Sequence, residues 1–128
     1  MQWGVLLSVG IGGFIGAVSR FLLAGWVQKV THSAFPFGTL SVNIIGSFFI
    51  GFLFFYVQQE NFPTALKLFL VTGLLGALTT FSTFSLETLV LFQQQMWVKA
   101  GCNILLNVGL SLLATLFGVF VFKKVFGI

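Results

Sequence analysis

The sequence predicts an all-α integral membrane protein with four transmembrane helices, and three observations support that prediction. Hydrophobic residues make up 58% of the 128 residues and charged residues only 6%, too few to cover the surface of a soluble domain. The apolar residues form four segments, each near the roughly 20 residues that a helix needs to cross a bilayer. The connections between them are short, so we expect a single transmembrane channel domain over residues 1–128.

The expected spans cover four apolar ranges, residues 3–27, 38–57, 66–92 and 100–122. Pro36 and Pro63 stand in the first two connections, where a proline does not interrupt the hydrogen bonds of a helix. No charged region precedes the first range, which is also too long for a signal peptide, so we expect it to be a retained span.

The first span contains a close-packing pattern and a buried charge. Gly12 and Gly16 have a spacing that lets another helix approach closely, and packing is the favoured interpretation. Arg20 lies inside the same span. An arginine at that depth extends to the interface, forms an ion pair or faces a water-filled cavity, and these alternatives stay open.

One face of the second span is polar or small. Asn43, Ser47 and Gly51 recur at a spacing of four, so they share one side of a helix. Asn43 places amide donors and an acceptor at membrane depth. Its ordinary role would be a hydrogen bond between helices.

The third span is predicted to break near the bilayer midplane. Residues 73–78 are expected to form ordinary membrane helix. Five hydroxyl residues then surround Phe81 and Phe84, namely Thr79, Thr80, Ser82, Thr83 and Ser85. Hydroxyls compete with the helix for backbone hydrogen bonds, and broken membrane helices often line ion or substrate sites. The alternative is a close-packed helix interface whose hydroxyls bond to their own turn.

The third span also carries the only acidic residue expected inside the membrane. Phe81 and Phe84 project from similar faces if the helix persists, and Glu87 follows on the same side. A carboxylate there needs a partner or water, and Arg20 is the candidate partner. We expect Glu87 to be structural or to lie at the mouth of a pore.

The fourth span has a polar stripe at a strict spacing of four, formed by Asn103, Asn107, Ser111 and Thr115. Such a stripe should turn away from lipid. It is either the polar wall of an ion path or a hydrogen-bonded seam between helices, and the spacing does not distinguish the two.

The charges predict a dual-topology protein. With four spans, one side of the membrane takes Lys67, Lys123 and Lys124, and the other takes Lys29 and Lys99, plus Arg20 if its side chain extends to that interface. A fixed orientation requires a clear excess of lysine and arginine on one side. Four short spans also give too little wall for a pore inside one chain. Two copies in opposite orientations would solve both problems, so we expect an antiparallel homodimer.

Several functional classes are excluded by composition. The basic residues are scattered, so no basic face exists for nucleic acid. Cys102 and His32 are single residues, which argues against a disulfide and against a structural metal site built from side chains. No nucleophile–base pair suggests an enzyme.

Two motifs carry a family resemblance, GTLSVNIIGSFFIG at residues 38–51 and GLLGALTTFSTFSLE at residues 73–87, together with the glycines and arginine of residues 12–20. Through them the chain resembles the fluoride channels of the Fluc (CrcB) family over essentially its whole length. Ala77 departs from the pattern, since many members have glycine there. The resemblance implies a passive channel that exports fluoride across a bacterial inner membrane, with two pores in an antiparallel homodimer.

The resemblance also implies site residues. The positive ring edges of Phe81 and Phe84 would line the pore. Asn43 would donate hydrogen bonds to the ion or hold the two rings. A polar track would follow, formed by Asn107, Ser111 and Thr115, and Arg20 would attract anions to the vestibule.

A structural Na⁺ is implied at the centre of the dimer, where the two interrupted helices cross. The backbone carbonyls of Gly76 and Thr79 would hold it, because carbonyl oxygens can replace the hydration shell of a cation.

Two other functions stay open. A small dual-topology multidrug/proton antiporter has the same number of spans, but it needs a membrane carboxylate, usually in the first span, and this first span has none. A structural membrane protein would show no ion flux.

Overall fold

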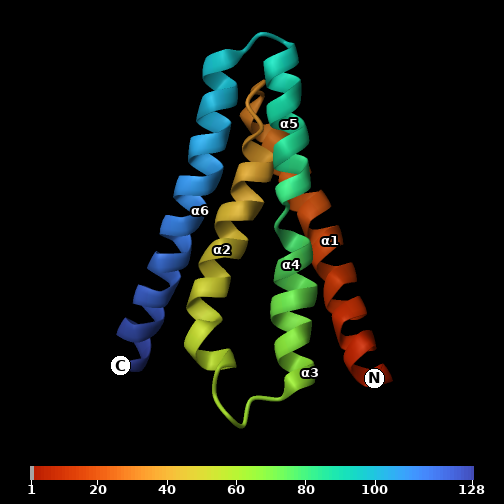
Figure 1. Ribbon diagram of the computed structural model, residues 1–128, viewed down its shortest axis with the longest axis vertical. Coiled ribbons are helices and arrows are strands. Elements are labelled where there is room, and N and C mark those ends of the chain that lie inside the picture. The colour runs from red at the N-terminus through yellow and green to blue at the C-terminus, as the bar shows by residue number, and fades with distance from the viewer. Residues whose placement is uncertain (1) are drawn as a thin grey trace.

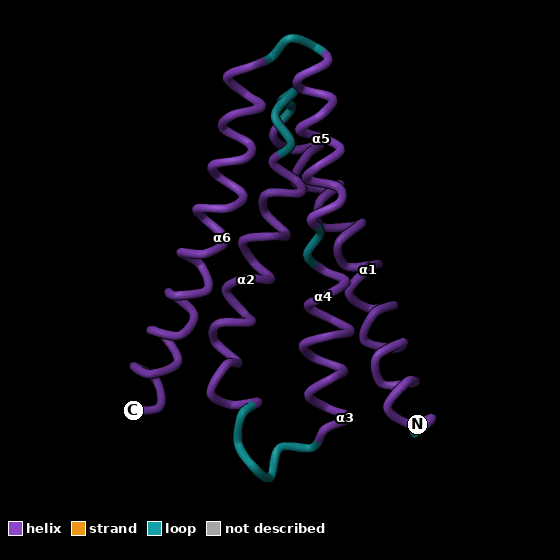
Figure 2. The backbone as a smooth tube through the Cα atoms, viewed as in Figure 1, coloured by secondary structure: helices purple, strands orange, loops and turns teal. Residues whose placement is uncertain are grey.

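The structure is a computed structural model that describes residues 2–128, and helices joined by short loops account for nearly all of it (Figures 1 and 2). The helices are, in order, α1 (Trp3–Thr31), α2 (Phe37–Val57), α3 (Thr64–Lys67), η1 (Leu68–Leu75), α4 (Gly76–Leu78), α5 (Phe81–Gln93) and α6 (Trp97–Phe126). No strand occurs within residues 2–128. Four helical stretches are long and apolar enough to cross a membrane when Thr64–Gln93 is taken as one span. The predicted all-α membrane class is confirmed.

The observed helices are longer than the apolar ranges in the sequence. The helix α1 continues to Thr31, and α6 runs from Trp97 to Phe126. Lys29, Lys123 and Lys124 stand in the last turns of these helices. Hydrophobicity marks only the part of a helix that suits lipid, whereas the backbone hydrogen bonds continue into polar turns. The ends of the spans therefore could not be read from hydrophobicity alone.

The four spans form a wedge (Figure 1). The connections α1–α2 and α5–α6 lie close together at one end. The helices diverge toward the other end, where both chain termini lie. The most extensive contacts pair α2 with α6 and α1 with η1, so the wedge consists of two helix pairs that spread apart.

Glycines bring α1 against η1. A Cβ atom on Gly12 would collide with the carbonyl oxygen of Phe69, and one on Gly16 with that of Leu74. The two main chains therefore touch, and both glycines are buried. The packing interpretation of this glycine pair is confirmed.

The pair α2–α6 is built in the same way. A Cβ atom on Gly51 would collide with the carbonyl oxygen of Thr115, and one on Gly118 with that of Phe48. Each helix thus contributes a glycine at a point where the partner's main chain passes. The polar face of α2 that includes Gly51 is in consequence directed at α6.

A glutamine side chain fixes the connection between α1 and α2. The Nε2 group of Gln28 donates to the carbonyl oxygens of Ser33 and Phe35, at 2.7 and 3.1 Å. Its Oε1 atom accepts a hydrogen bond from the N–H of Gly38 at 3.1 Å. One carboxamide therefore satisfies backbone groups that the loop and the first turn of α2 leave without helical partners.

Before its interruption, the third span contains a π-helix where an α-helix was expected. Residues 73–78 were expected to be ordinary helix, but Leu68–Leu75 form a π-helix and only Gly76–Leu78 follow as α-helix. That expectation was wrong. A π-helix bonds each residue to the fifth preceding one rather than the fourth. A continuous apolar run such as LFLVTGLL has no polar face, so its pattern cannot distinguish the two windings.

Thr79 and Thr80 separate α4 from α5. Their backbones are extended, with φ and ψ of −87° and 156° at Thr79 and −152° and 118° at Thr80. The Oγ1 atom of Thr80 accepts a hydrogen bond from the N–H of Thr83 at 3.2 Å. Thr80 is therefore the N-cap of α5, a position at which threonine satisfies a free N–H group.

Candidate functional site

A cavity of about 420 Å³ lies between α2, the third span and α6. It brings together most of the site residues expected from the sequence, namely Asn43, Gly76, Thr79, Phe81, Phe84, Asn107 and Ser111. Its lining contains no acidic or basic side chain. An ion in this cavity would meet aliphatic side chains as well as amides, hydroxyls and aromatic rings. We call this space the aromatic cavity.

Asn43 compensates for the hydrogen bonds lost between α4 and α5. Its Oδ1 atom accepts from the N–H of Thr80 at 2.8 Å, and its Nδ2 group donates to the carbonyl oxygen of Thr80 at 3.1 Å. Its other amide hydrogen goes to Oδ1 of Asn107 at 2.9 Å. Both amide hydrogens of Asn43 are therefore engaged within the chain, and the side chain holds the extended segment in place.

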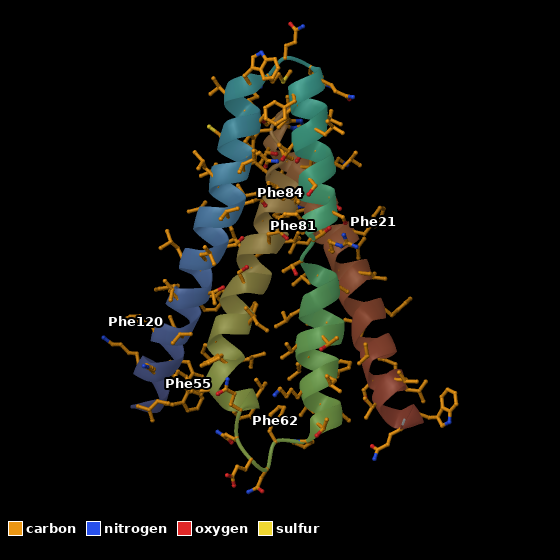
Figure 3. All side chains as sticks on the ribbon, viewed as in Figure 1. Phe21, Phe55, Phe62, Phe81, Phe84 and Phe120 are labelled. Atoms are coloured by element: carbon orange, nitrogen blue, oxygen red, sulfur yellow. The ribbon has the colours of Figure 1, made fainter. Side chains whose placement is uncertain are left out.

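Phe81 and Phe84 begin α5 and line the aromatic cavity (Figure 3). Their ring centroids are 5.2 Å apart with an edge-to-face angle of 67°. They differ in environment, because Phe84 is 7% exposed and Phe81 is 75% exposed. The predicted proximity of the two rings is present, but only Phe84 is packed within the single chain.

A second cavity of about 430 Å³ lies between α1, α2 and α5, and Arg20 and Glu87 both line it. The Oε1 atom of Glu87 accepts a hydrogen bond from Thr39 at 2.7 Å. Its Oε2 atom is buried and has no hydrogen-bond partner in the described chain. The structure thus places the two charges around one space without a hydrogen bond between Arg20 and Oε2. We call this space the charged cavity.

Thr80 lines both cavities. Thr80 is the N-cap of α5 and is hydrogen-bonded to Asn43. It lies between the charged cavity and the aromatic cavity. The sequence showed it only as one of five neighbouring hydroxyls. Its partner lies 37 positions earlier, on another helix, and no spacing rule could have found that contact.

The polar stripe of α6 is divided between the two alternatives that the sequence left open. Asn103 and Asn107 are buried and hydrogen-bonded to each other, with Nδ2 of Asn107 donating to the main-chain and side-chain oxygens of Asn103, both at 2.9 Å. Asn107 also accepts from Asn43 of α2, and Asn103 donates to Thr88 of α5, so these two residues form a seam between helices. Asn107 and Ser111 line the aromatic cavity as well. Thr115 lies outside both cavities, and its hydroxyl donates to the carbonyl oxygen of Ser111 at 3.1 Å.

The carbonyl groups near the interruption are suited to a cation. In a continuous helix the N–H of Thr80 would donate to the carbonyl oxygen of Gly76, but here it donates to Asn43. The Gly76 carbonyl thereby loses its helical partner, and Gly76 is exposed in the single chain. Free carbonyl oxygens are ligands that hard cations accept. Residues 2–128 contain no cluster of His, Cys, Asp or Glu that could hold a metal ion instead.

The comparisons with known proteins show the family to which the chain is related. The family model described as CrcB-like protein, Camphor Resistance (CrcB), matches residues 7–119. Over 127 residues the chain is 56% identical to the fluoride-specific ion channel FluC of Nitratiruptor sp., covering 99% of this chain and 98% of that relative. A protein of the same name from Sulfurovum sp. is 52% identical over 127 residues, covering 99% and 100% of the two chains.

A further relative with that name, from Campylobacter jejuni, is 49% identical over 118 residues, covering 92% of this chain and 97% of the relative. The matches extend through all four spans, including the interruption and both cavities. The resemblance carried by the two sequence motifs is therefore confirmed, and the chain, a multi-pass membrane protein, belongs to the CrcB-like family.

Proposed function

We propose that this protein is a fluoride-selective channel through which fluoride leaves the bacterial cytoplasm along its electrochemical gradient. The observation that carries the proposal is the high identity, over nearly the whole chain, to relatives named fluoride-specific ion channels. A channel of this kind performs no covalent chemistry, so the protein is not an enzyme. The expected location is the inner membrane.

The chemistry of the aromatic cavity supports passage of a small anion. The positive edges of Phe81 and Phe84 attract an anion without the full charge that would retain it. Ser111 and Asn107 add polar groups to the lining of the same cavity. Conduction requires binding strong enough to admit the ion and weak enough to release it, which suits a cavity without charged side chains.

In the proposed path, fluoride meets Arg20 before it reaches the aromatic cavity. Arg20 lines the charged cavity, where a guanidinium group raises the local concentration of anions. Thr80 borders both spaces, so we place the path of fluoride from the charged cavity, past Thr80, to Phe81 and Phe84. Thr115 would come last in the polar track, although in the single chain it packs against α2.

An antiparallel homodimer completes the site. The nearly balanced charges of the two membrane sides favour insertion in both orientations. Phe81 lines the aromatic cavity yet is 75% exposed in one chain, so a second copy would cover it. Two copies would give two pores, one for each aromatic cavity.

The carbonyls of Gly76 and Thr79 would hold a structural Na⁺ between the two copies. The redirected N–H of Thr80 supports this assignment, because it leaves the Gly76 carbonyl free. Bound there, the ion would supply positive charge close to the pores. The protein's own part is to keep the helix interrupted after α4, and Asn43 does this by holding Thr80.

Fluoride efflux from liposomes that contain the purified protein tests the proposal, with a fluoride electrode as the readout. Valinomycin is added to remove the membrane potential, and chloride efflux is measured in parallel. Fast fluoride efflux that requires valinomycin, with negligible chloride efflux, is the expected result. Absence of fluoride efflux from well-folded protein would overturn it.

The antiporter alternative makes a different prediction. It requires proton-coupled movement of a cationic dye, with Glu87 as the acid inside the spans. Glu87 is bonded to Thr39 beside Arg20, and a guanidinium group in the same cavity opposes binding of a cation. Dye transport driven by a proton gradient would support the antiporter.

A further inference from the structure

A continuous chain of hydrogen bonds leads from the interruption of the third span to the middle of α5. It passes from Thr80 through Asn43 and Asn107 to Asn103, whose Nδ2 group donates to Oγ1 of Thr88 at 2.9 Å. Every member is buried. Asn103 is fully buried, with 0% of its surface exposed. Nothing in the proposed ion path requires Asn103 or Thr88, since neither lines a cavity.

The hydrogen bonds at both ends of this network are consistent with a single direction. At one end the main-chain N–H of Thr80 can only donate, so Asn43 must turn its oxygen toward it. At the other end the hydroxyl of Thr88 gives its hydrogen to the carbonyl oxygen of Phe84 at 2.8 Å. With its hydrogen donated there, its oxygen accepts from the Nδ2 group of Asn103.

The three carboxamides between these ends have no freedom left. Asn103 accepts from Asn107, and Asn107 accepts from Asn43. Reversal of any one of them would set two NH₂ groups or two oxygens against each other. Each side-chain nitrogen and oxygen of the three carboxamides has at least one partner within the network, which favours this one arrangement.

We propose that Thr88 and Asn103 are positioning residues, which fix the orientation of Asn107 and Asn43 and thereby hold the extended Thr79–Thr80 segment. Their side chains act on the pore without touching the ion. Thr88 ends the network by accepting a hydrogen bond from Asn103, and Asn103 in turn accepts from Asn107, which lines the aromatic cavity. The inference rests on the proposed function only for its flux measurement.

Two substitutions at Thr88 separate positioning from packing. Thr88→Val keeps the shape of the side chain and removes the hydroxyl, whereas Thr88→Ser keeps the hydroxyl and removes the methyl group. Positioning predicts that the valine variant is impaired and that the serine variant resembles the wild type. A purely packing role predicts the opposite order.

Hydrogen exchange of the main-chain amides at residues 79–82 is the primary readout. In Thr88→Val the Thr80 amide should exchange about three- to twenty-fold faster, the range given by measured strengths of hydrogen bonds between membrane helices. Fluoride flux should fall in the same variant and be retained in Thr88→Ser. Unchanged exchange in Thr88→Val would overturn the proposal.

Thr31→Val is the matched control. Thr31 also donates its hydroxyl to a carbonyl oxygen in the preceding turn, that of Val27 at 2.9 Å, but it is exposed at the end of α1 and belongs to no network. This variant should leave both exchange and flux unchanged. An equal effect from Thr31→Val would show that loss of any such hydroxyl suffices, and would overturn the specific role of Thr88.

A measurement on the wild-type protein covers the case in which the valine variant fails to fold. The side-chain NH₂ groups of Asn43, Asn103 and Asn107 should all exchange slowly with solvent in an NMR experiment. Fast exchange at Asn103 would overturn the proposal. Absence of fluoride flux from the wild type would refute the proposed function alone, since neither exchange measurement depends on it.

Discussion

The contact between α1 and η1 and the junction between α4 and α5 satisfy buried backbone in opposite ways. At the first, Gly12 and Gly16 have no side chain, so two intact helices come into contact. At the second, the helix is interrupted, and the side chain of Asn43 takes over the hydrogen bonds of Thr80. The α1–η1 contact depends on the absence of Cβ atoms, whereas the α4–α5 junction depends on the carboxamide of Asn43. Substitutions should therefore act differently in the two.

Removal of the Asn43 carboxamide should have the largest effect. In Asn43→Leu the N–H and carbonyl groups of Thr80 and Oδ1 of Asn107 lose their partner. Each unsatisfied buried group costs about 1–3 kcal/mol. We expect a lower thermal midpoint and loss of fluoride flux in liposomes. Wild-type flux would show that the junction is held by other contacts.

Addition of one methyl group to the glycine contact should come next. In Gly12→Ala the new Cβ atom would collide with the main chain of η1, and overpacking of this kind costs about 1–3 kcal/mol. Gly13 is the matched control, because a Cβ atom there has no neighbour within 4 Å. Gly13→Ala should be neutral or slightly stabilising. Equal unfolding midpoints for the two variants would contradict the close contact.

The aromatic pair should show an effect on flux rather than on stability. In Phe84→Ile or Phe81→Ile the positive ring edge is lost while the side chain stays apolar, and the interactions of such rings correspond to a change of about tenfold at most. Fluoride flux should fall while size-exclusion chromatography shows the elution volume of the wild type. Undiminished flux in both single variants would eliminate the role of the ring edges.

The smallest effect is expected for a hydroxyl that bonds only to its own turn. Ser85 is exposed, and its Oγ atom donates to the carbonyl oxygen of Phe81 at 2.9 Å. Ser85→Ala should change the free energy of unfolding by less than about 0.5 kcal/mol, as is usual for exposed positions. A large effect would mean that the hydroxyl cluster acts as a whole, and the distinction between networked and local hydroxyls would fail.

Patterns along one helix were predictable from the sequence, and contacts between distant helices were not. The spacing of Gly12 and Gly16 predicted a close helix contact, and the run of hydroxyls marked the place where Thr79 and Thr80 become extended. Hydrophobic periodicity carries information about one helix at a time. It therefore could not show that Asn43 bonds to Thr80.

Electrostatic partners were equally hard to predict. Arg20 was the only candidate cation for Glu87, yet the carboxylate bonds to Thr39, a residue to which the sequence drew no attention. The choice depends on side-chain reach and on the shape of the charged cavity. Among the 18 phenylalanines of the chain, the family motif identified Phe81 and Phe84, because composition alone does not distinguish these two from the others.

The wedge shape of the chain has a consequence for the lipid around it. One chain occupies little area in the leaflet that holds the α1–α2 and α5–α6 connections, and more in the leaflet that holds the termini (Figure 1). Alone, it would impose curvature on the bilayer. Two copies in opposite orientations place a narrow end beside a wide end in each leaflet. The proposed antiparallel dimer would therefore occupy equal area in both leaflets and suit a flat membrane.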